Sequence, residues 1–160
     1  MDREADKPAT PSIWLAVIPS TLAFAACAAP WMWARQPAFA FALQRGFSLV
    51  CHQHADRSFF LFGGSVAVCA RCLGIYIGAA AGLLVRLPRQ VAKQLFFYAV
   101  ALNAIDWLAE FLGVHGNWMA LRFGFGFALG MAAMMLVAAS IIPTEIPVAN
   151  TSPIGNGGKA

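Results

Sequence analysis

Four apolar stretches constrain the fold of this chain more than any other feature of its sequence. They cover residues 13–33, 70–87, 94–114 and 119–142. A helix needs about 20 mainly apolar residues to cross the hydrocarbon core of a bilayer, and each stretch approaches or exceeds that length. Charged residues make up 11% of the chain, against about 25% in soluble domains, so a water-soluble fold would expose too much apolar surface. The sequence therefore predicts an all-α, four-helix integral membrane bundle.

These stretches also define the domain organisation. Residues 1–12 form an N-terminal tail, residues 13–142 the four-span membrane domain, and residues 143–160 a proline- and glycine-rich tail that we expect to be disordered. A loop at residues 45–74, between the first two membrane helices, carries cysteines and histidines. The net charge is +4, but the basic residues are scattered singly along the chain, which excludes nucleic acid as a partner.

The distribution of basic residues also predicts an orientation. Arg86, Arg89 and Lys93 lie in the connection between the second and third stretches, and short loops rich in lysine and arginine face the cytoplasm. We therefore expect a multi-pass protein of a bacterial plasma (inner) membrane, in contact with lipid, with both termini cytoplasmic. Arginines in the first connection make this bias a weak one. The sequence leaves the oligomeric state open.

Glycines at four-residue spacing indicate where helices pack closely. Gly74, Gly78 and Gly82 lie on one face of the second stretch, and Gly126 and Gly130 on one face of the fourth. Small residues at this spacing let helix backbones approach each other in lipid. We expect packing within the bundle, in preference to a dimer interface.

A β-hairpin is expected in the loop before the second stretch. Two short apolar runs, residues 59–62 and 66–68, flank Gly63 and Gly64, and a glycine pair between such runs predicts a two-residue turn. The hairpin would carry the chain back towards its start. Cysteines on either side of it would then meet.

The residues that would meet are typical of a metal site. Cys69 and Cys72 form a Cys-x-x-Cys motif, and Cys51 precedes the hairpin together with His52 and His54. Three thiolates and one imidazole complete a tetrahedral Cys3His zinc site. The spacing Cys51-x-x-His54 favours His54, because adjacent residues such as Cys51 and His52 point apart in an extended chain.

Three other readings of the cysteines remain open. They fit buried small residues, a structural disulfide in an oxidising compartment, or a redox pair, Cys69 and Cys72, that exchanges electrons with a lipid quinone. A zinc enzyme with Asp106 or Glu110 as general base is a further alternative. It is less favoured because a Cys3His set leaves zinc no open coordination position. The sequence does not decide whether the protein is an enzyme, and its catalytic residues are unknown.

Around these cysteines the sequence resembles a known family. The pattern consists of Cys51-His52-Gln53, Arg57-Ser58-Phe59, Cys69-x-Arg71-Cys72-x-Gly74-x-Tyr76-x-Gly78, Asp106 and Arg122-x-x-x-Gly126-x-x-x-Gly130. It resembles that of the small prokaryotic membrane proteins of domain-of-unknown-function family 2085, over roughly residues 45–135. The resemblance implies a membrane fold and a shared Cys/His site centred on His52, without an established activity.

Ionisable residues inside the third stretch point to a buried pocket. Asn103, Asp106 and Glu110 share one helix face. A charge near the bilayer centre costs about 2.5 to 3.5 kcal/mol on insertion scales, so Asp106 must face the protein interior and find a partner. An ion pair between Asp106 and an arginine that only locks helices together is the purely structural alternative.

Topology brings these charges to the membrane surface that carries the cysteines. The second and fourth stretches begin at this surface and the third ends there. We expect a pocket beside the metal site lined by Arg57, Arg71, Tyr76, Asp106, Glu110 and Arg122. Such a pocket suits a small molecule, a lipid head group or an ion. The sequence thus predicts a small membrane protein whose zinc cluster covers a ligand pocket.

Overall fold

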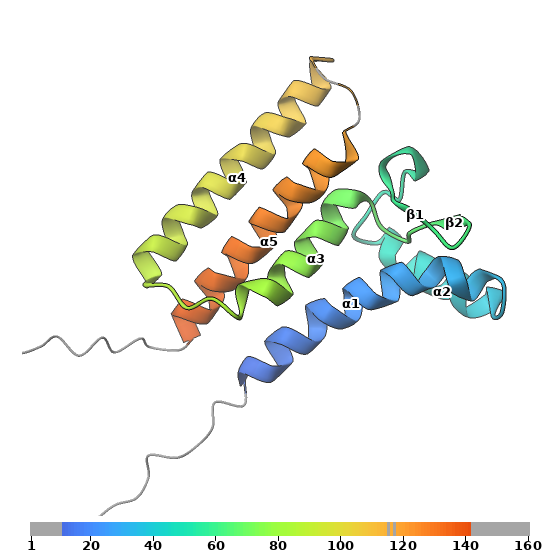
Figure 1. The fold of residues 1–160 in the computed structure, drawn as a ribbon, viewed down its shortest axis with the longest axis horizontal. Helices are drawn as coiled ribbons and strands as arrows, with labels where there is room; N and C mark the ends of the chain where they lie inside the picture. Colours follow the sequence, from blue (N-terminus) through green and yellow to red (C-terminus); the bar gives the residue numbers. More distant parts are fainter. Residues whose placement is uncertain (1–10, 115, 117, 142–160) are drawn as a thin grey trace, which may run out of the picture.

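The computed structural model describes residues 11–114, 116 and 118–141. Within them the chain is mostly helical, as predicted (Figure 1). In order along the chain the elements are α1 (Pro11–Trp33), α2 (Pro37–Ser48), a 3₁₀ turn η1 (Ala55–Arg57), β1 (Phe60–Leu61), β2 (Gly64–Ser65), α3 (Ala70–Gly82), α4 (Arg89–Phe111) and α5 (Met119–Ile141). Residues 1–10 and 142–160, which hold most of the two predicted tails, lie outside the described residues.

Helix α5 organises the bundle. It packs against α3 on one side and α4 on the other, while α3 also packs against α1 (Figure 1). The start of α3, the end of α4 and the start of α5 lie at one end of this bundle, next to the hairpin (Figure 1). That end is where the sequence predicted the site.

The regularly spaced glycines of α3 and α5 lie in the interface between these two helices, which confirms the prediction that they pack within the bundle. A Cβ atom added to Gly74, Gly78 or Gly82 would lie closer than 3.0 Å to a backbone carbonyl oxygen of α5. The same addition at Gly126 or Gly130 would meet a carbonyl oxygen of α3 at less than 3.0 Å. The two backbones are in direct contact, and any side chain at these positions would force them apart.

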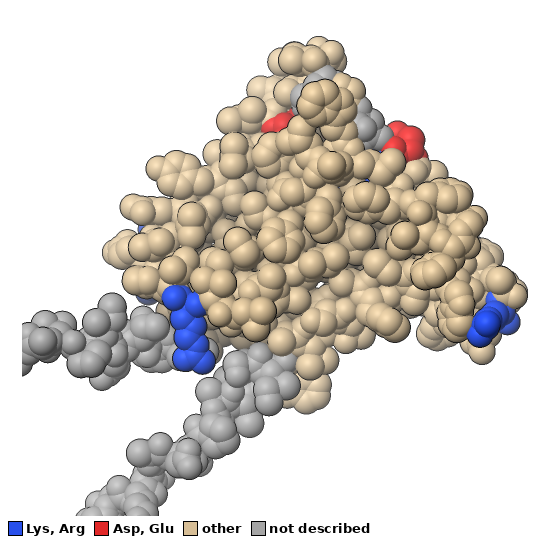
Figure 2. Space-filling model, in the orientation of Figure 1, with Lys and Arg blue, Asp and Glu red and all other residues tan. Residues whose placement is uncertain are grey.

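Two helices are long and apolar enough to cross a membrane. They are Trp14–Trp33 of α1 and Met119–Ile141 of α5, with 28% and 22% of their most apolar windows buried. Their apolar side chains therefore mostly face outward, unlike those of a core helix in a soluble protein. Figure 2 shows one face of the molecule, where charged side chains lie near the edges and the broad centre carries few.

The second and third predicted spans differ from the helices observed. Helix α3 ends at Gly82 instead of residue 87 and has 13 residues, a length of about 20 Å at 1.5 Å per residue. Tight turns at Leu84 and Val85 follow. Pro88 then disfavours a helical conformation at the residue before it, Leu87. Helix α4 begins directly after Pro88, five residues earlier than predicted. It carries four charged residues, so the predicted four-span bundle is not established.

Helix α2 was not predicted. It begins with Pro37 at its first position, where the missing N–H of proline costs no hydrogen bond. Buried Ala40 and Phe47 lie on the inner face of α2, whereas Phe39 and Phe41 are exposed. With α2 ending at Ser48 and α3 beginning at Ala70, the Cys/His loop spans residues 49–69 instead of 45–74.

Candidate metal centre and polar cavity

The first cysteine lies in a tight turn that follows α2. The Cys51 amide donates to the Phe47 carbonyl at 2.9 Å, and the chain then reverses at Gln53, which has a φ of 50°. The Cys51 sulfur accepts backbone N–H bonds from Gln53 and Cys69, the latter at 3.2 Å. Backbone amides around a cysteine sulfur stabilise its thiolate, as in zinc knuckles.

Gln53 holds this turn in place, a role that the sequence did not assign to it. Its side-chain nitrogen donates to the carbonyls of Gln44 at 2.6 Å and Ala67 at 2.8 Å. The first carbonyl belongs to α2 and the second to the segment between β2 and α3. Gln53 therefore links the two chain segments that flank the cysteines, which gives the glutamine after the Cys-His pair a structural role.

The hairpin forms as predicted, with its turn one residue earlier. Phe60 pairs with Ser65 and Leu61 with Gly64, so Phe62 and Gly63 occupy the turn, both with positive φ. Positive φ at both central positions is a type I′ turn, which matches the twist of paired strands. The hairpin returns the chain to Cys69.

The segment between β2 and α3 is anchored to α1 through a carbonyl that has no partner within α1 because of a proline. Pro30 has no N–H, so the carbonyl of Ala26 lacks its helical partner. The Ala67 amide donates to this carbonyl at 3.3 Å. Val66, Ala67 and Val68 are buried against α1, which fixes the position of the next residue, Cys69.

The structure brings the three predicted cysteine ligands together. The sulfur atoms of Cys51, Cys69 and Cys72 lie within 4.8 Å of one another. Cys51 is buried and the other two are half-buried. Hydrogen bonds from the Cys69 and Cys72 thiols and from backbone amides hold the pKa of the Cys51 thiol far below its usual value. A group of three such sulfurs can hold a metal ion.

Neither predicted histidine belongs to this group. His52 and His54 are exposed, and their rings stack on each other with centroids 6.3 Å apart and an interplanar angle of 4°. The set of ligand atoms that lie mutually within 4.8 Å contains the cysteines alone. Both rings nevertheless line the same cavity as the cysteines.

A cavity of about 370 Å³ lies between the cysteines and the charged residues of the bundle. Its lining comes from the Cys/His loop, α3, α4 and α5. The residues are Val50, Cys51, His52, Gln53, His54, Arg57, Cys69, Arg71, Cys72, Trp107, Glu110 and Arg122. Four of the six residues expected in the pocket, Arg57, Arg71, Glu110 and Arg122, therefore lie beside the cysteines. Asp106 does not line this cavity, and Val50, Gln53 and Trp107 were not anticipated in its lining.

Three ion pairs connect the elements around this cavity. Glu110 of α4 pairs with Arg122 of α5 and with Arg57 of the loop, the latter at 3.1 Å. Asp106, the next residue on that face of α4, pairs with Arg71 of α3. Asp106 and Arg122 are only 5% and 4% exposed. Charges this deeply buried need partners, and the pairs supply them.

A glycine closes α4 shortly after Glu110. Gly113, with a φ of 68°, terminates the helix, and its amide and that of Val114 donate to the carbonyls of Glu110 and Ala109. This is the Schellman arrangement that closes many helices. Asp106 lies five residues before the end of α4, which is about 7.5 Å from that end along the helix axis. It is therefore closer to the end of α4 than to the middle of the helix.

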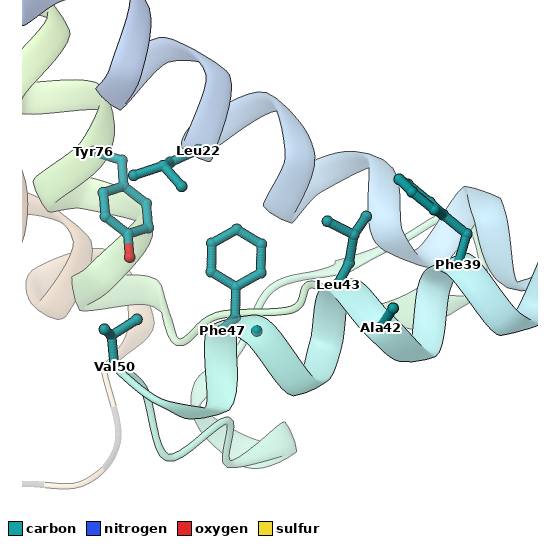
Figure 3. Close-up of a pocket in the computed structure, with 8 residues that line it drawn as sticks. Leu22, Phe39, Ala42, Leu43, Phe47, Val50 and Tyr76 are labelled. Atoms are coloured by element: carbon teal, nitrogen blue, oxygen red, sulfur yellow. The ribbon is translucent and has the colours of Figure 1, made fainter.

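Tyr76, another predicted pocket residue, lines a different cavity. A space of about 470 Å³ opens between α1 and α2, and Figure 3 shows Leu22, Phe47 and Tyr76 around it. The rings of Phe47 and Tyr76 lie 6.3 Å apart. Tyr76 lies one helical turn after Cys72 on α3, and its ring lines the apolar cavity together with Leu22 of α1.

Comparison with known proteins identifies the family. Residues 51–136 match the family described as "Predicted membrane protein (DUF2085)", which confirms the resemblance found in the sequence. The chain belongs to this family. The matched segment begins at Cys51 and ends within α5. It contains the cysteine cluster, every lining residue of the polar cavity except Val50, and the α3–α5 interface, and it leaves out α1 and α2.

Two archaeal proteins described as uncharacterised are similar to part of this chain. An uncharacterised protein of Methanocaldococcus jannaschii is 35% identical over 98 residues, which are 57% of this chain and 63% of that protein. The match thus covers less than two thirds of the length of the M. jannaschii protein. An uncharacterised protein of Methanothermobacter thermautotrophicus is 30% identical over 95 residues, 56% of this chain and 86% of that protein. No solved structure matches the chain.

Proposed function

We propose that this protein is a multi-pass protein of the plasma membrane that binds a zinc ion through Cys51, Cys69 and Cys72. The observation that carries the proposal is the mutual approach of their three sulfurs to within 4.8 Å. Zinc is the metal that thiolate-rich tetrahedral sites most often hold in structural roles. Its role here is to fix the loop over the polar cavity.

A histidine completes the site. The proposal takes the fourth ligand from His52 or His54, because both line the cavity beside the sulfurs and are exposed. A histidine-to-alanine change at the ligand position weakens zinc binding, whereas the same change at the other position leaves it intact. The two single variants therefore identify the ligand.

The cavity is the functional part of this proposal. Charged groups from the loop, α3, α4 and α5 converge on a space large enough for a small molecule, a lipid head group or an ion. Most of these groups are held by ion pairs between different elements, which makes the wall rigid. Four membrane spans, with the basic α3–α4 connection and both termini in the cytoplasm, place this cavity at the outer surface.

Metal content tests the central claim. The full-length protein is purified in detergent, and its zinc is compared with that of Cys72→Ser and Cys27→Ser. Cys27 is a half-buried free cysteine of α1 outside the cluster, so it serves as the matched control. We expect about one zinc per chain in the wild type and in Cys27→Ser, and a large loss in Cys72→Ser. Metal-free wild-type protein with three alkylatable cluster thiols contradicts the proposal.

A redox function is the second candidate, favoured by the proximity of the Cys51 sulfur to both sulfurs of the Cys69–Cys72 motif. In that case the two motif thiols form a disulfide and pass two electrons and two protons to a lipid quinone, which becomes a quinol. Trapping thiols in whole cells separates the candidates. A Cys69–Cys72 disulfide that appears and disappears with quinone supply supports the redox function and overturns the zinc site.

A further inference from the structure

Two cavities of opposite character meet at one residue. The apolar cavity between α1 and α2 has a volume of about 470 Å³ and the polar cavity about 370 Å³. Val50 lines both, and it is the one residue common to the two linings in the described part of the chain. Val50 is 67% exposed, so it forms an open edge between the cavities rather than a closed wall.

The apolar cavity becomes polar only towards this edge. Its lining consists of Leu22, Phe39, Ala42, Leu43, Gly46, Phe47, Val50 and Tyr76. The Tyr76 hydroxyl is the one polar side-chain group in this set, and it points towards Val50 (Figure 3). A ligand here would be a hydrocarbon chain over most of its length, with its polar part at the Val50 end.

The polar cavity carries an excess of positive charge. Its lining has three guanidinium groups, Arg57, Arg71 and Arg122, and one carboxylate, Glu110. Asp106 and Asp56, which pair with Arg71 and Arg57, lie outside the lining. The Nε atoms of Arg71 and Arg122 are buried without a hydrogen-bond acceptor among the described residues. Guanidinium groups bind phosphate oxygens strongly because their N–H groups match the spacing of these oxygens.

The position of the cavities fits the surface of a bilayer. Trp31 and Trp33, at the end of α1, are exposed, and Arg35 lies over the Trp31 ring at 4.4 Å. Tryptophans and arginines at the end of a membrane helix occupy the level of the lipid head groups. The apolar cavity begins beside Leu22, about 14 to 16 Å along the helix from these tryptophans, at the depth of acyl chains.

We propose that the two cavities together bind one phospholipid with an anionic head group. Its phosphate lies against the arginines of the polar cavity, and one acyl chain passes Val50 into the space between α1 and α2. This inference deepens the ligand-binding part of the proposed function and does not depend on the metal. The surplus of arginines over carboxylates in the lining of the polar cavity favours an anionic lipid over a zwitterionic one, and the apolar cavity favours a lipid over a free phosphate.

Filling the apolar cavity tests the proposal. A Cβ added to Gly46 meets nothing within 4 Å, so Gly46→Phe places a ring in the cavity without displacing the backbone. Gly124→Phe is the matched control, because Gly124 is also a helical glycine with open space around it and lines neither cavity. Arg57→Gln and Arg45→Gln form a second pair, of which only Arg57 lines the polar cavity.

The measurement is native mass spectrometry of the full-length protein released from detergent with phosphatidylglycerol or phosphatidylcholine of the same acyl chains. We expect one phosphatidylglycerol per wild-type chain, and about tenfold weaker binding in Gly46→Phe with no change in Gly124→Phe. Arg57→Gln should lose the preference for phosphatidylglycerol, while Arg45→Gln keeps it. Zinc content, measured in parallel, should be the same in all of these variants.

Three results would overturn the inference. The first is equal binding of the two lipids by the wild type, and the second is unchanged lipid binding in Gly46→Phe. The third is displacement of the lipid by millimolar inorganic phosphate, which would identify a free anion as the ligand. Loss of zinc with retained lipid would instead overturn the metal site alone, so the failures of the two proposals are distinguishable.

Discussion

A single methyl group on α5 should separate the packing face of this helix from its open face. Gly126 and Gly124 lie two residues apart on α5. An alanine Cβ at position 126 would come within 3.0 Å of the Arg71 backbone, whereas at position 124 it would meet nothing within 4 Å. The two substitutions are chemically identical, so any difference between them reports the α3–α5 contact.

The expected magnitude follows from two opposing terms. Replacing glycine by alanine in a helix stabilises it by about 1 kcal/mol at either position. At position 126 the added methyl also meets backbone atoms, which cannot rotate away, and overpacking of this kind costs about 1 to 3 kcal/mol. We expect Gly124→Ala to be stabilising by up to about 1 kcal/mol and Gly126→Ala to be destabilising by up to about 2 kcal/mol.

Reversible unfolding in mixed micelles measures this difference. The chain has five tryptophans, whose fluorescence follows unfolding as the fraction of denaturing detergent rises. The two variants should differ by the overpacking cost of about 1 to 3 kcal/mol, which is about fivefold to more than a hundredfold in the folding equilibrium constant. Equal stability of the two variants would refute the conclusion that α3 and α5 are in backbone contact through Gly126.

Three further predictions concern the charged wall and its supports. Asp106→Asn removes the carboxylate that pairs with Arg71 and should lower the free energy of unfolding by about 3 kcal/mol, with partial recovery in the Arg71→Gln/Asp106→Asn double variant. Gln53→Ala removes two hydrogen bonds and should weaken zinc binding about tenfold in competition with a chelator, whereas Gln90→Ala, at the far end of α4, should not. Gly113→Ala forces an alanine into a left-handed conformation and should lower unfolding stability by about 1 to 2 kcal/mol, which thermal unfolding monitored by circular dichroism can detect.

The parts of the fold that could be predicted are those that depend on the apolar composition of a segment and on the spacing of its residues. The apolar lengths of α1 and α5 and the glycine spacing of the α3–α5 interface are direct properties of the sequence. Helix α2 was missed because its 12 residues are too few to span a bilayer and its phenylalanines alternate at positions 39 and 41, which obscures the helical period. The early end of α3 depends on tight turns that length and hydropathy do not reveal.

The candidate site likewise has features that the sequence predicts and features that it does not. The approach of Cys51 to the Cys69–Cys72 motif could be predicted, because a hairpin between them requires only a turn signal and two apolar runs. The direction of the histidines could not, because it depends on the positive φ of Gln53, a conformation that a glutamine rarely adopts. Tyr76 was placed in the wrong cavity for a similar reason, since sequence spacing does not specify which neighbouring helix faces each side of α3.

Residues 69–72 connect the metal centre, the charged wall and the helix packing. Within one turn they supply two sulfurs of the cluster, the Arg71 partner of Asp106, and the backbone that contacts Gly126. A shift of this segment therefore changes all three features at once. Because packed backbones do not deform gradually, Gly126→Ala should weaken zinc binding although residue 126 does not belong to the cysteine cluster. The close contact between α3 and α5 is thus part of the site, since it sets where the sulfurs and the arginines lie relative to each other.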